Sequence, residues 1–504
     1  MSGTDDARYD LAIIGGGING VGIARDAAGR GLKVLLLEKD DLGSHTSSQS
    51  TKLVHGGLRY LEHYEFRLVA EALAEREVLL RAAPHIIAPL QFVLPHEPHL
   101  RPTWMIRAGL FLYDHLGRRE TLPSSFGARL RGTPWGAGLK PNFERGFVYS
   151  DARVDDARLV VINAIAAREL GAEIRTRTRV VGARRDGASW RVSFTGASGA
   201  AAEARAGALV NAGGPWVKQV LDGVCGAPMP ADVRHVKGSH IVVPRVHAQE
   251  HAYILQNADN RVAFVIPYQG EFSLIGTTDV AVTEFEAPAI SPEEVDYLCE
   301  IANAYLAKPI AARDVVWSYS GVRPLYDDGS ANPADVTRDY VLKLDAGADG
   351  AMPLLSIFGG KITTYRRLAE AALAELKPFL PAMKGAWTER EPLPGGDMPP
   401  GGLAACEREL AARCAWLPVG LRAALVRRHG TRVSRVLGEA KSLQALGRHF
   451  GDTLYAAEVD YLVGQEWAQE ADDVLWRRTK CGLHLDADAA GRVALYLRQR
   501  RGSS

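Results

Sequence analysis

Cysteine is scarce in this sequence, and its spacing is irregular. The 504 residues include five cysteines, an odd number, and no two of them have C-x-x-C spacing. Disulfide frameworks use even numbers of cysteines, and structural zinc sites use closely spaced pairs. The sequence therefore argues against both and favours a reducing compartment. We expect no metal site, because His85, His96 and His99 also lack the spacing of metal ligands.

An excess of charge is absent as well. The chain has 60 basic and 59 acidic residues, which give a formal net charge of +1. Nucleic-acid-binding proteins usually have a strong basic excess, so nucleic acid is not an expected partner. The chain contains no stretch of about 18 consecutive apolar residues, and no membrane-spanning helix is expected. Its polar, acidic start, MSGTDDAR, is unlike a signal peptide. Association with a membrane surface remains open.

Residues 9–39 contain the strongest motif of the chain. An apolar run leads into G-x-G-x-x-G at Gly15, Gly17 and Gly20, and a helix rich in small residues and a second apolar run ending at Glu38 follow. The first glycine permits a tight turn, the second lets a pyrophosphate approach the backbone, and the third lets the helix lie close to the strand. Glu38 is placed to accept hydrogen bonds from a ribose. We predict a bound dinucleotide, although this motif alone does not distinguish FAD from NAD.

Three later segments have the composition of ligand-binding loops. Residues 42–57 are rich in Ser, Thr and Gly and follow the second strand, where they would lie beside the cofactor. Residues 207–217 read as a strand that runs into a glycine turn. Residues 354–373 read as a strand, a Gly-Gly turn and a helix, which predicts a second anion site. We expect these segments to surround one ligand, and together they favour FAD over NAD.

The rest of the sequence indicates further domains. Residues 237–279 alternate apolar residues with turn signals, as in an antiparallel sheet. Residues 83–102 are expected to be irregular and extended. Residues 101–119 predict an apolar, aromatic helix with basic ends, which fits either a core helix or a helix in a membrane interface. Residues 391–402 have the composition of a linker, and helices follow it. The basic run at 477–480 is expected on a solvated or domain-docking face.

These motifs together resemble a known family across most of the chain. The sequence is similar to the FAD-dependent glycerol-3-phosphate dehydrogenases of the aerobic, respiratory type. The similarity rests on IIGGGINGVGIARDAAGRG, TSSQSTKLVHGGLRYLEHYEFRLVAEALAEREVLL, RPTWMIRAGLFLYDHLG, VKGSHIVVPR, IGTTD, WSYSGVRPL, FGGKITTYRRLAE and ADDVLWRRTKCGL.

The resemblance implies a fold of α/β and α+β class. It would combine a Rossmann-like FAD-binding domain of glutathione-reductase or amino-acid-oxidase type, an antiparallel-sheet substrate domain and a C-terminal helical domain. We expect the FAD-binding domain to be discontinuous, with residues 8–80, 146–232 and 351–386. The substrate-binding domain would take residues 81–145 and 233–350, the linker 387–402, and the helical domain 403–504.

The activity that the resemblance implies is oxidation of sn-glycerol 3-phosphate to dihydroxyacetone phosphate, with hydride transfer to N5 of non-covalently bound FAD. The electrons would pass to ubiquinone or menaquinone. Such enzymes of glycerol metabolism are commonly homodimers, cytoplasmic and peripheral on the cytoplasmic face of the inner membrane. Two alternatives remain open. One is a glycerol-3-phosphate oxidase that reduces O₂, and the other is a nicotinamide-binding or non-catalytic dinucleotide-sensing protein.

The expected cofactor site draws on all the glycine turns. Its predicted residues are Gly15, Gly17, Ile18, Asn19, Gly20, Glu38, Lys39, Thr46, Ser47, Ser48, Ser50, Lys52, Leu53, His55, Gly57, Ala212, Gly213, Trp216, Gly359, Gly360, Lys361, Ile362 and Thr363.

The expected substrate site needs fixed cations for a phosphate. Arginine is suited to that role, because it is always charged and binds phosphate through two parallel hydrogen bonds. Arg59 and Arg323 are the candidates, with Tyr60 and Thr278 as further substrate contacts. Arg323 is also counted as catalytic.

Oxidation of a secondary alcohol also needs a base for the hydroxyl proton. Histidine has a pKa suited to that step. His55 is the first candidate because it lies in the ligand-side loop, and His240 is the second. Asp279 would orient either of them, and Lys361 would lie near the flavin.

Overall fold

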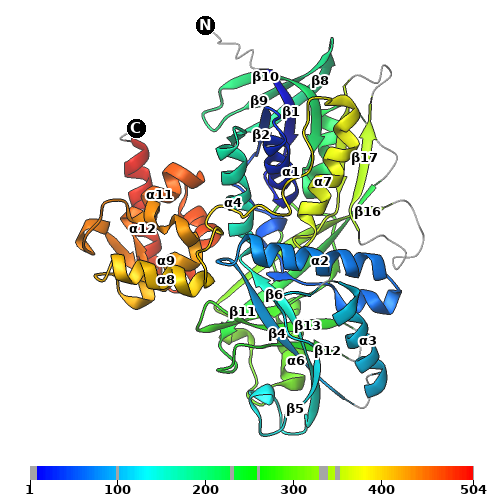
Figure 1. Ribbon diagram of the computed structural model, residues 1–504, viewed down its shortest axis with the longest axis vertical. Helices are drawn as coiled ribbons and strands as arrows, with labels where there is room; N and C mark the ends of the chain where they lie inside the picture. Colours follow the sequence, from blue (N-terminus) through cyan, green and yellow to red (C-terminus); the bar gives the residue numbers. More distant parts are fainter. Residues whose placement is uncertain are drawn as a thin grey trace.

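The computed structural model describes residues 8–97, 101–117, 119–227, 232–257, 261–327, 339–346 and 352–502. His99, considered above, lies outside them. Two large sheets follow one another along the long axis of the molecule, and the C-terminal helices lie to one side of them (Figure 1).

The first sheet has eight strands and contains the N-terminal motif. Its strands are β1 (Arg8–Ile14), β2 (Val34–Leu37), β7 (Glu173–Arg175), β8 (Arg179–Asp186), β9 (Ser189–Thr195), β10 (Ala201–Asn211), β17 (Val341–Asp345) and β18 (Leu354–Phe358). The order is β17-β18-β10-β1-β2-β7, and β9 pairs with both β10 and β8. The four strands around β1 run parallel to it or to its neighbours. This parallel arrangement is the Rossmann-like one that the resemblance implies.

Helices cover one face of this sheet. They are α1 (Ile18–Gly29), α4 (Asp156–Glu169) and α7 (Tyr365–Leu376), and they share one apolar core with the strands. On the opposite face, β8, β9 and the short α5 (Val217–Gln219) bury a second core that includes Trp190. The close packing of α1 depends on Gly20, because a Cβ atom there would lie 1.9 Å from the carbonyl oxygen of Gly15.

The second sheet has ten strands. They are β3 (Leu53–Val54), β4 (Ile87–Pro95), β5 (Phe126–Arg129), β6 (Arg145–Val154), β11 (Asp232–Pro244), β12 (Ala252–Gln256), β13 (Val262–Tyr268), β14 (Phe272–Gly276), β15 (Val280–Ala281) and β16 (Trp317–Asp327). The order is β15-β11-β14-β13-β12-β4-β6-β3, with β16 beside β11 and β5 beside β6. Most pairs are antiparallel, as predicted, but β12 and β4 are parallel.

Helices lie on both faces of the second sheet. One face packs on α2 (Phe66–Ala82) and α3 (Thr103–Leu116), and the other on α6 (Pro292–Tyr305). The range of α3 is close to the helix predicted at residues 101–119. Among the helices that the structure describes, none is long and apolar enough to cross a membrane.

One expectation about this sheet is wrong. Residues 83–102 contain the regular strand β4, which the prolines obscured; β4 pairs with β6 along its whole length. In addition, β3 and β6 belong to the second sheet, although both fall in ranges that we assigned to the FAD-binding domain. Tertiary pairing decides both cases, and the local sequence does not carry that information.

The C-terminal part is a separate helical unit with its own apolar core. It contains α8 (Gly402–Arg413), α9 (Val419–His429), α10 (Val433–Leu437), α11 (Ala456–Glu466), α12 (Ala487–Gly502) and a small hairpin of β19 (His449–Gly451) and β20 (Leu454–Tyr455). A π-helical segment, Asp473–Arg478, lies between α11 and α12 in the chain. The helices were predicted, whereas the hairpin was not.

The close approach at Gly20 leads to a test. Gly20→Ala should lower the midpoint of thermal unfolding by about 5 °C or more, because the new methyl group overlaps a backbone atom. Gly109→Ala is the matched control within α3, since a Cβ atom there has open space; it should raise the midpoint slightly. Equal midpoints for the two variants would contradict the close contact between α1 and the turn before it.

Candidate cofactor and substrate site

The N-terminus of α1 is arranged to receive an anion. Its first turn contains no acidic residue, and Gly17 at the N-cap provides no side-chain cap. Ser47 partly fills that role, because its Oγ accepts a hydrogen bond from the Ile18 N–H at 3.0 Å. The positive end of the helix dipole is therefore not neutralised by the chain itself, as expected for a pyrophosphate site.

Glu38 lies at the end of β2, beside this turn. Its two carboxylate oxygens accept hydrogen bonds from the backbone N–H groups of Gly16 (2.6 Å) and Asp40 (2.7 Å). Burial raises the pKa of Glu38, while these two N–H groups act in the opposite direction. A carboxylate has about four acceptor positions, so two bonds leave room for ribose hydroxyls.

The three predicted glycine turns meet at one place. Gly15 has a φ of +110°, and a Cβ atom there would lie 2.4 Å from the carbonyl oxygen of Ala212, in the second turn. Asn19 donates from Nδ2 to the carbonyl oxygen of Gly359, in the third turn, at 3.0 Å. A Cβ atom on Gly360 would lie 2.8 Å from the same side chain. Segments more than 300 residues apart in sequence therefore form one cradle.

The cradle fits a dinucleotide cofactor. Among the residues that the structure describes, the buried Oδ1 of Asn19 has no hydrogen-bond partner, as expected of a group that faces a ligand. At one end, Lys39 Nζ lies 4.4 Å from the centre of the Trp216 ring, and His45 packs on the same ring. An aromatic and cationic end of this kind suits a nucleotide base.

The other end of the cradle carries the groups suited to catalysis. The backbone N–H of His55 donates to Thr363 Oγ1 at 3.3 Å. Nearby, Lys361 Nζ lies 4.3 Å from the centre of the Tyr60 ring. Gly57, with a φ of +73°, makes the turn between His55 and Tyr60. Burial lowers the pKa of His55; Asp151 opposes this effect, while Lys361 adds to it. The imidazole is therefore neutral near pH 7 and able to accept a proton.

The two arginine candidates are on different elements. Arg59 lies with Tyr60 in a short 3₁₀ helix, Leu58–His63. Arg323 lies on β16, half-exposed, and its Nη2 is 2.9 Å from Oδ1 of Asp279. The preceding residue, Val322, accepts a hydrogen bond from Thr46 Oγ1 at 2.7 Å, which brings β16 against the cofactor loop.

Asp279 was expected to orient one of the two histidines, and the structure corrects this expectation. Its carboxylate pairs with Arg323, whereas His240 contacts Thr51 Oγ1 through Nε2 at 3.0 Å and stacks on Tyr319. Burial lowers the pKa of His240 to about 3. His240 is therefore the weaker of the two candidate bases, since so low a pKa gives little driving force for accepting a proton.

Several other predicted ligand contacts are structural in this fold. Thr278 donates to Glu294 at 2.7 Å and accepts from the Ser239 N–H at 2.9 Å, so its hydroxyl is used inside the second sheet. Lys52 is buried, and its ammonium contacts both Asp156 oxygens (2.9 and 3.0 Å) and the Ser48 carbonyl (2.9 Å). Side chains in the same loop are engaged likewise: Ser50 Oγ donates to Asp156, Ser48 Oγ donates to the His45 carbonyl, and Leu53 packs in an apolar core.

A buried polar cluster behind His55 was missed. Tyr113 Oη donates to Asp151 at 2.8 Å and accepts from the Gly56 N–H at 2.9 Å, while Arg76 Nη1 is 2.7 Å from Asp151. These side chains come from α3, β6 and α2. The sequence analysis predicted the helix that contains Tyr113 but not the strand β6, and no sequence pattern indicates that these polar residues meet. In the part of the chain that the structure describes, no group of three or more His, Cys, Asp or Glu side chains could hold a metal ion.

The parallel, Rossmann-like sheet, the glycine cradle and the adjoining, mostly antiparallel sheet define the class as FAD-dependent oxidoreductase. The model of the FAD dependent oxidoreductase family matches residues 10–366, and that of the C-terminal domain of alpha-glycerophosphate oxidase matches residues 386–500.

Individual relatives narrow this class. The chain is 56% identical over 490 residues to glycerol-3-phosphate dehydrogenase of Pseudomonas aeruginosa, covering 97% of this chain and 95% of the relative. It is 53% identical over 492 residues to aerobic glycerol-3-phosphate dehydrogenase of Escherichia coli, covering 97% of each. It is also 52% identical over 478 residues to D-erythritol 1-phosphate dehydrogenase of Brucella abortus, covering 94% of this chain and 95% of the relative.

A solved structure is similar over almost its full length. The glycerol-3-phosphate dehydrogenase of Bacillus halodurans, complexed with FAD, has a TM-score of 0.73 and 25% identity, covering 98% of this chain and 94% of that chain. The chain therefore belongs to the glycerol-3-phosphate dehydrogenases within the FAD-dependent oxidoreductase family. It is an FAD-dependent enzyme, and the cradle described above fits that cofactor.

The neutral state of His55 leads to a prediction. If His55 accepts the substrate proton, kcat/KM should fall on the acid side of about pH 6.5, as the lowered pKa of His55 is passed and the base form is lost. His55→Asn should lower kcat about 100-fold and abolish that acid limb. His240→Asn, measured in parallel, should retain the limb. An unchanged pH profile in His55→Asn would remove this residue from the role of base.

Proposed function

We propose that this chain oxidises sn-glycerol 3-phosphate to dihydroxyacetone phosphate and delivers the electrons to a membrane quinone, ubiquinone or menaquinone. The observation that supports it most is the placement of Lys361, Tyr60 and neutral His55 at one end of a dinucleotide cradle, with Arg59 in the same short helix as Tyr60. FAD, when bound, supplies the hydride acceptor. The names of the relatives given above identify small polyol phosphates as their substrates. Such substrates fit a site with several cations.

The side chains divide the chemistry between them. Arg59 and Arg323 hold the phosphate, and Asp279 keeps the Arg323 guanidinium oriented until a phosphate arrives. His55 takes the proton from the C2 hydroxyl while the C2 hydride leaves. Lys361 and the turn before α7 provide positive potential for the reduced cofactor. Oxidation thus removes one hydride and one proton from the substrate.

A second substrate is D-erythritol 1-phosphate. The relative with that name is almost as similar to this chain as the glycerol-3-phosphate dehydrogenases are. Both compounds combine a phosphate with a secondary alcohol, so the same cations and base would serve. Comparing kcat/KM for the two compounds assigns the preferred substrate; the proposal requires the higher value for glycerol 3-phosphate.

The enzyme is proposed to work as a peripheral protein, with α3 in the membrane interface and a homodimer as the assembly. The inner side of α3 is buried through Leu110 and Tyr113. Its outer side exposes Trp104 (69%) and Phe111 (63%), and Tyr64 next to α2 is 79% exposed. Exposed aromatic residues with basic neighbours suit the boundary between headgroups and acyl chains. This placement would put the enzyme on the cytoplasmic face of the inner membrane, where it meets quinone.

Arg323 provides the test of the substrate site. Arg323→Ala should raise KM for glycerol 3-phosphate about 30-fold while FAD stays bound, because a charged hydrogen bond to the phosphate is lost. Arg185→Ala is a matched control, since Arg185 is also a partly exposed arginine with an aspartate partner, Asp345. Unchanged KM in Arg323→Ala would place the phosphate elsewhere.

The electron acceptor is tested separately. With glycerol 3-phosphate as donor, quinol formation should account for the oxidised substrate, and peroxide should stay at background. Stoichiometric peroxide would identify an oxidase instead. Purified protein without flavin absorbance near ~450 nm would instead favour the dinucleotide sensor, because that band comes from the bound isoalloxazine.

The α3 surface is tested with vesicles that contain phosphatidylglycerol. The double variant Trp104→Ser, Phe111→Ser should bind them about tenfold less tightly, since two aromatic side chains no longer enter the interface. Val419→Ser is the control, because Val419 is 68% exposed in the C-terminal unit. Equal binding of both variants would move the contact away from α3.

A further inference from the structure

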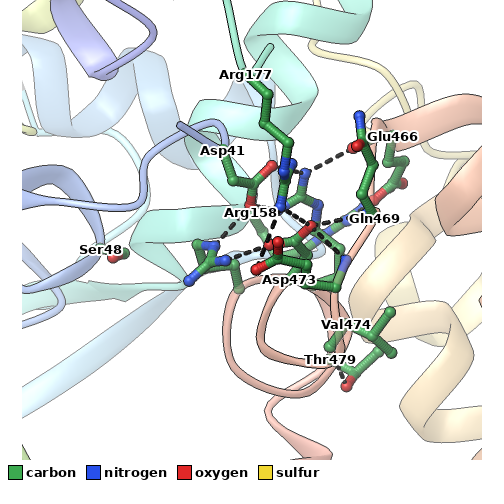
Figure 2. A network of polar contacts seen from close by, with 12 residues as sticks. Asp41, Ser48, Arg158, Arg177, Glu466, Gln469, Asp473, Val474 and Thr479 are labelled. Carbon is green, nitrogen blue, oxygen red and sulfur yellow. Dashed lines mark hydrogen bonds and ion pairs between the residues drawn. The ribbon is translucent and has the colours of Figure 1, made fainter. Parts of the chain in front are cut away.

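The C-terminal unit meets the FAD-binding half through buried charges. We call residues 473–480, the π-helical segment and the two residues after it, the docking segment. Asp473 of this segment pairs with Arg177, whose Nη2 lies 2.8 Å from Asp473 Oδ2 (Figure 2). In the same network, Arg158 pairs with Glu466. Arg478 and Lys480 are both almost completely buried. The basic run at 477–480 was expected on a solvated or domain-docking face, and docking is what the structure confirms.

One contact leads from Arg478 to the fingerprint turn. Arg478 Nη2 is 2.8 Å from Asp41 Oδ1, and its other terminal nitrogen contacts Asp41 Oδ2. Asp41 begins the short turn in which the Gly43 N–H donates to the Gly16 carbonyl at 3.1 Å. Gly16 in turn donates to Glu38. A short series of hydrogen bonds therefore connects the Arg478 guanidinium to Glu38, the expected ribose contact, and to the glycine turn expected to bind the pyrophosphate.

A second contact leads from Lys480 to the flavin-side loop. Lys480 Nζ is 3.1 Å from Asp155 Oδ1, and Asp155 caps the N-terminus of α4 by accepting from the Arg158 N–H at 3.1 Å. The next residue, Asp156, receives the ammonium of Lys52 and the hydroxyl of Ser50. The cap thus fixes the residue that anchors the cofactor loop.

A third contact leads to the substrate sheet. Trp476 stacks on Trp317 of β16, with ring centres 4.5 Å apart. Trp317 packs on Tyr319, whose hydroxyl donates to the Ser50 carbonyl at 2.7 Å. The same strand carries Arg323. One short segment therefore touches the fingerprint turn, the cofactor loop and the strand that bears a substrate arginine.

Buried ion pairs are a poor means of simple attachment. Removing charges from water offsets most of their attraction, and apolar side chains of similar size attach domains at least as well. What a bidentate, fully buried pair provides is a fixed geometry. The two ion pairs, Arg478 with Asp41 and Lys480 with Asp155, are therefore better explained by a need for precise placement than by a need for adhesion.

We propose that the docking segment is a positioning device for the FAD site, in which Arg478 acts through Asp41 and Lys480 acts through Asp155. Neither residue is among the predicted cofactor contacts; each contacts an aspartate beside them. The inference depends on FAD as cofactor and not on the substrate or the quinone proposed above, so either can fail without the other.

The test measures FAD retention by diluted holoenzyme, followed by the fluorescence of released flavin. Arg478→Met and Lys480→Met should each raise the FAD dissociation constant about tenfold or more, which corresponds to ~1.4 kcal/mol. They should also shift the visible band of the flavin that remains bound. Lys480→Arg should restore most of the affinity, because it keeps a cation beside Asp155.

A double-mutant cycle identifies the route. Asp155→Asn removes the charge but keeps a residue that caps helices well. If Lys480 acts through Asp155, adding Asp155→Asn to Lys480→Met should change the FAD dissociation constant by less than about twofold. Full additivity of the two changes would overturn this route.

Arg428→Met is the matched control for loss of a buried arginine. Arg428 is in the same unit, but its side chain bonds to Glu458, Thr453 and Cys481, all within it. This variant should lower the unfolding midpoint and leave FAD affinity unchanged. If Arg478→Met and Lys480→Met behave in the same way, the docking segment only stabilises and the proposal is wrong. If Arg478→Met does not fold, the Lys480 and Asp155 variants decide the outcome.

Discussion

The seating of α1 on β1 is the contact on which the rest of the structure depends. Gly20 faces the carbonyl oxygen of Gly15 with no space for a side chain, and Gly15 itself lies against Ala212. This seating directs the N-terminus of α1 into the cradle and places Asn19 where it reaches Gly359. A helix held further from the sheet would lose the dipole at the phosphates and the link to the third turn together. The cofactor site therefore depends on glycine at positions 15 and 20, where a side chain would not fit.

The sequence predicted those parts of the fold that have a local cause. The glycine turns, Glu38, the helix after the fingerprint and the helix at residues 101–119 follow from spacing and composition, and the structure has them. β4 was missed because its hydrogen-bond partner, β6, is far away in sequence: Pro95 pairs with Gly146, and Ile87 pairs with Val154. In addition, the prolines within residues 83–102 suggested irregular backbone. Thr278 and Lys52 have side chains that suit ligand binding, yet both bond to buried carboxylates. Which polar residue faces a ligand and which faces another polar residue depends on tertiary neighbours alone.

Buried charge is the second theme of the molecule. Lys52 with Asp156, Arg76 with Asp151 and Arg478 with Asp41 are all nearly free of solvent. Each pair joins elements from different parts of the chain. Lys52 is itself a predicted cofactor contact, Asp151 accepts a hydrogen bond from the Gly56 N–H, and Asp41 lies two residues after Lys39. Such pairs contribute little net stability, but they tolerate few alternative arrangements. A redox enzyme must hold the flavin, a base and the substrate phosphate in fixed relative positions, and buried ion pairs help because they allow few alternative arrangements.

The distribution of the cradle along the chain has a consequence for biosynthesis. Its turns lie near residues 15, 212 and 360, and the docking segment that braces it ends at residue 480 of 504. A chain emerging from the ribosome forms contacts in order of synthesis, and long-range contacts form last. The site therefore cannot be completed until almost the whole chain has been made. A nascent chain arrested between residues 212 and 360 would have the fingerprint but not the third turn of the cradle, and one arrested before residue 473 would have the cradle without the docking segment.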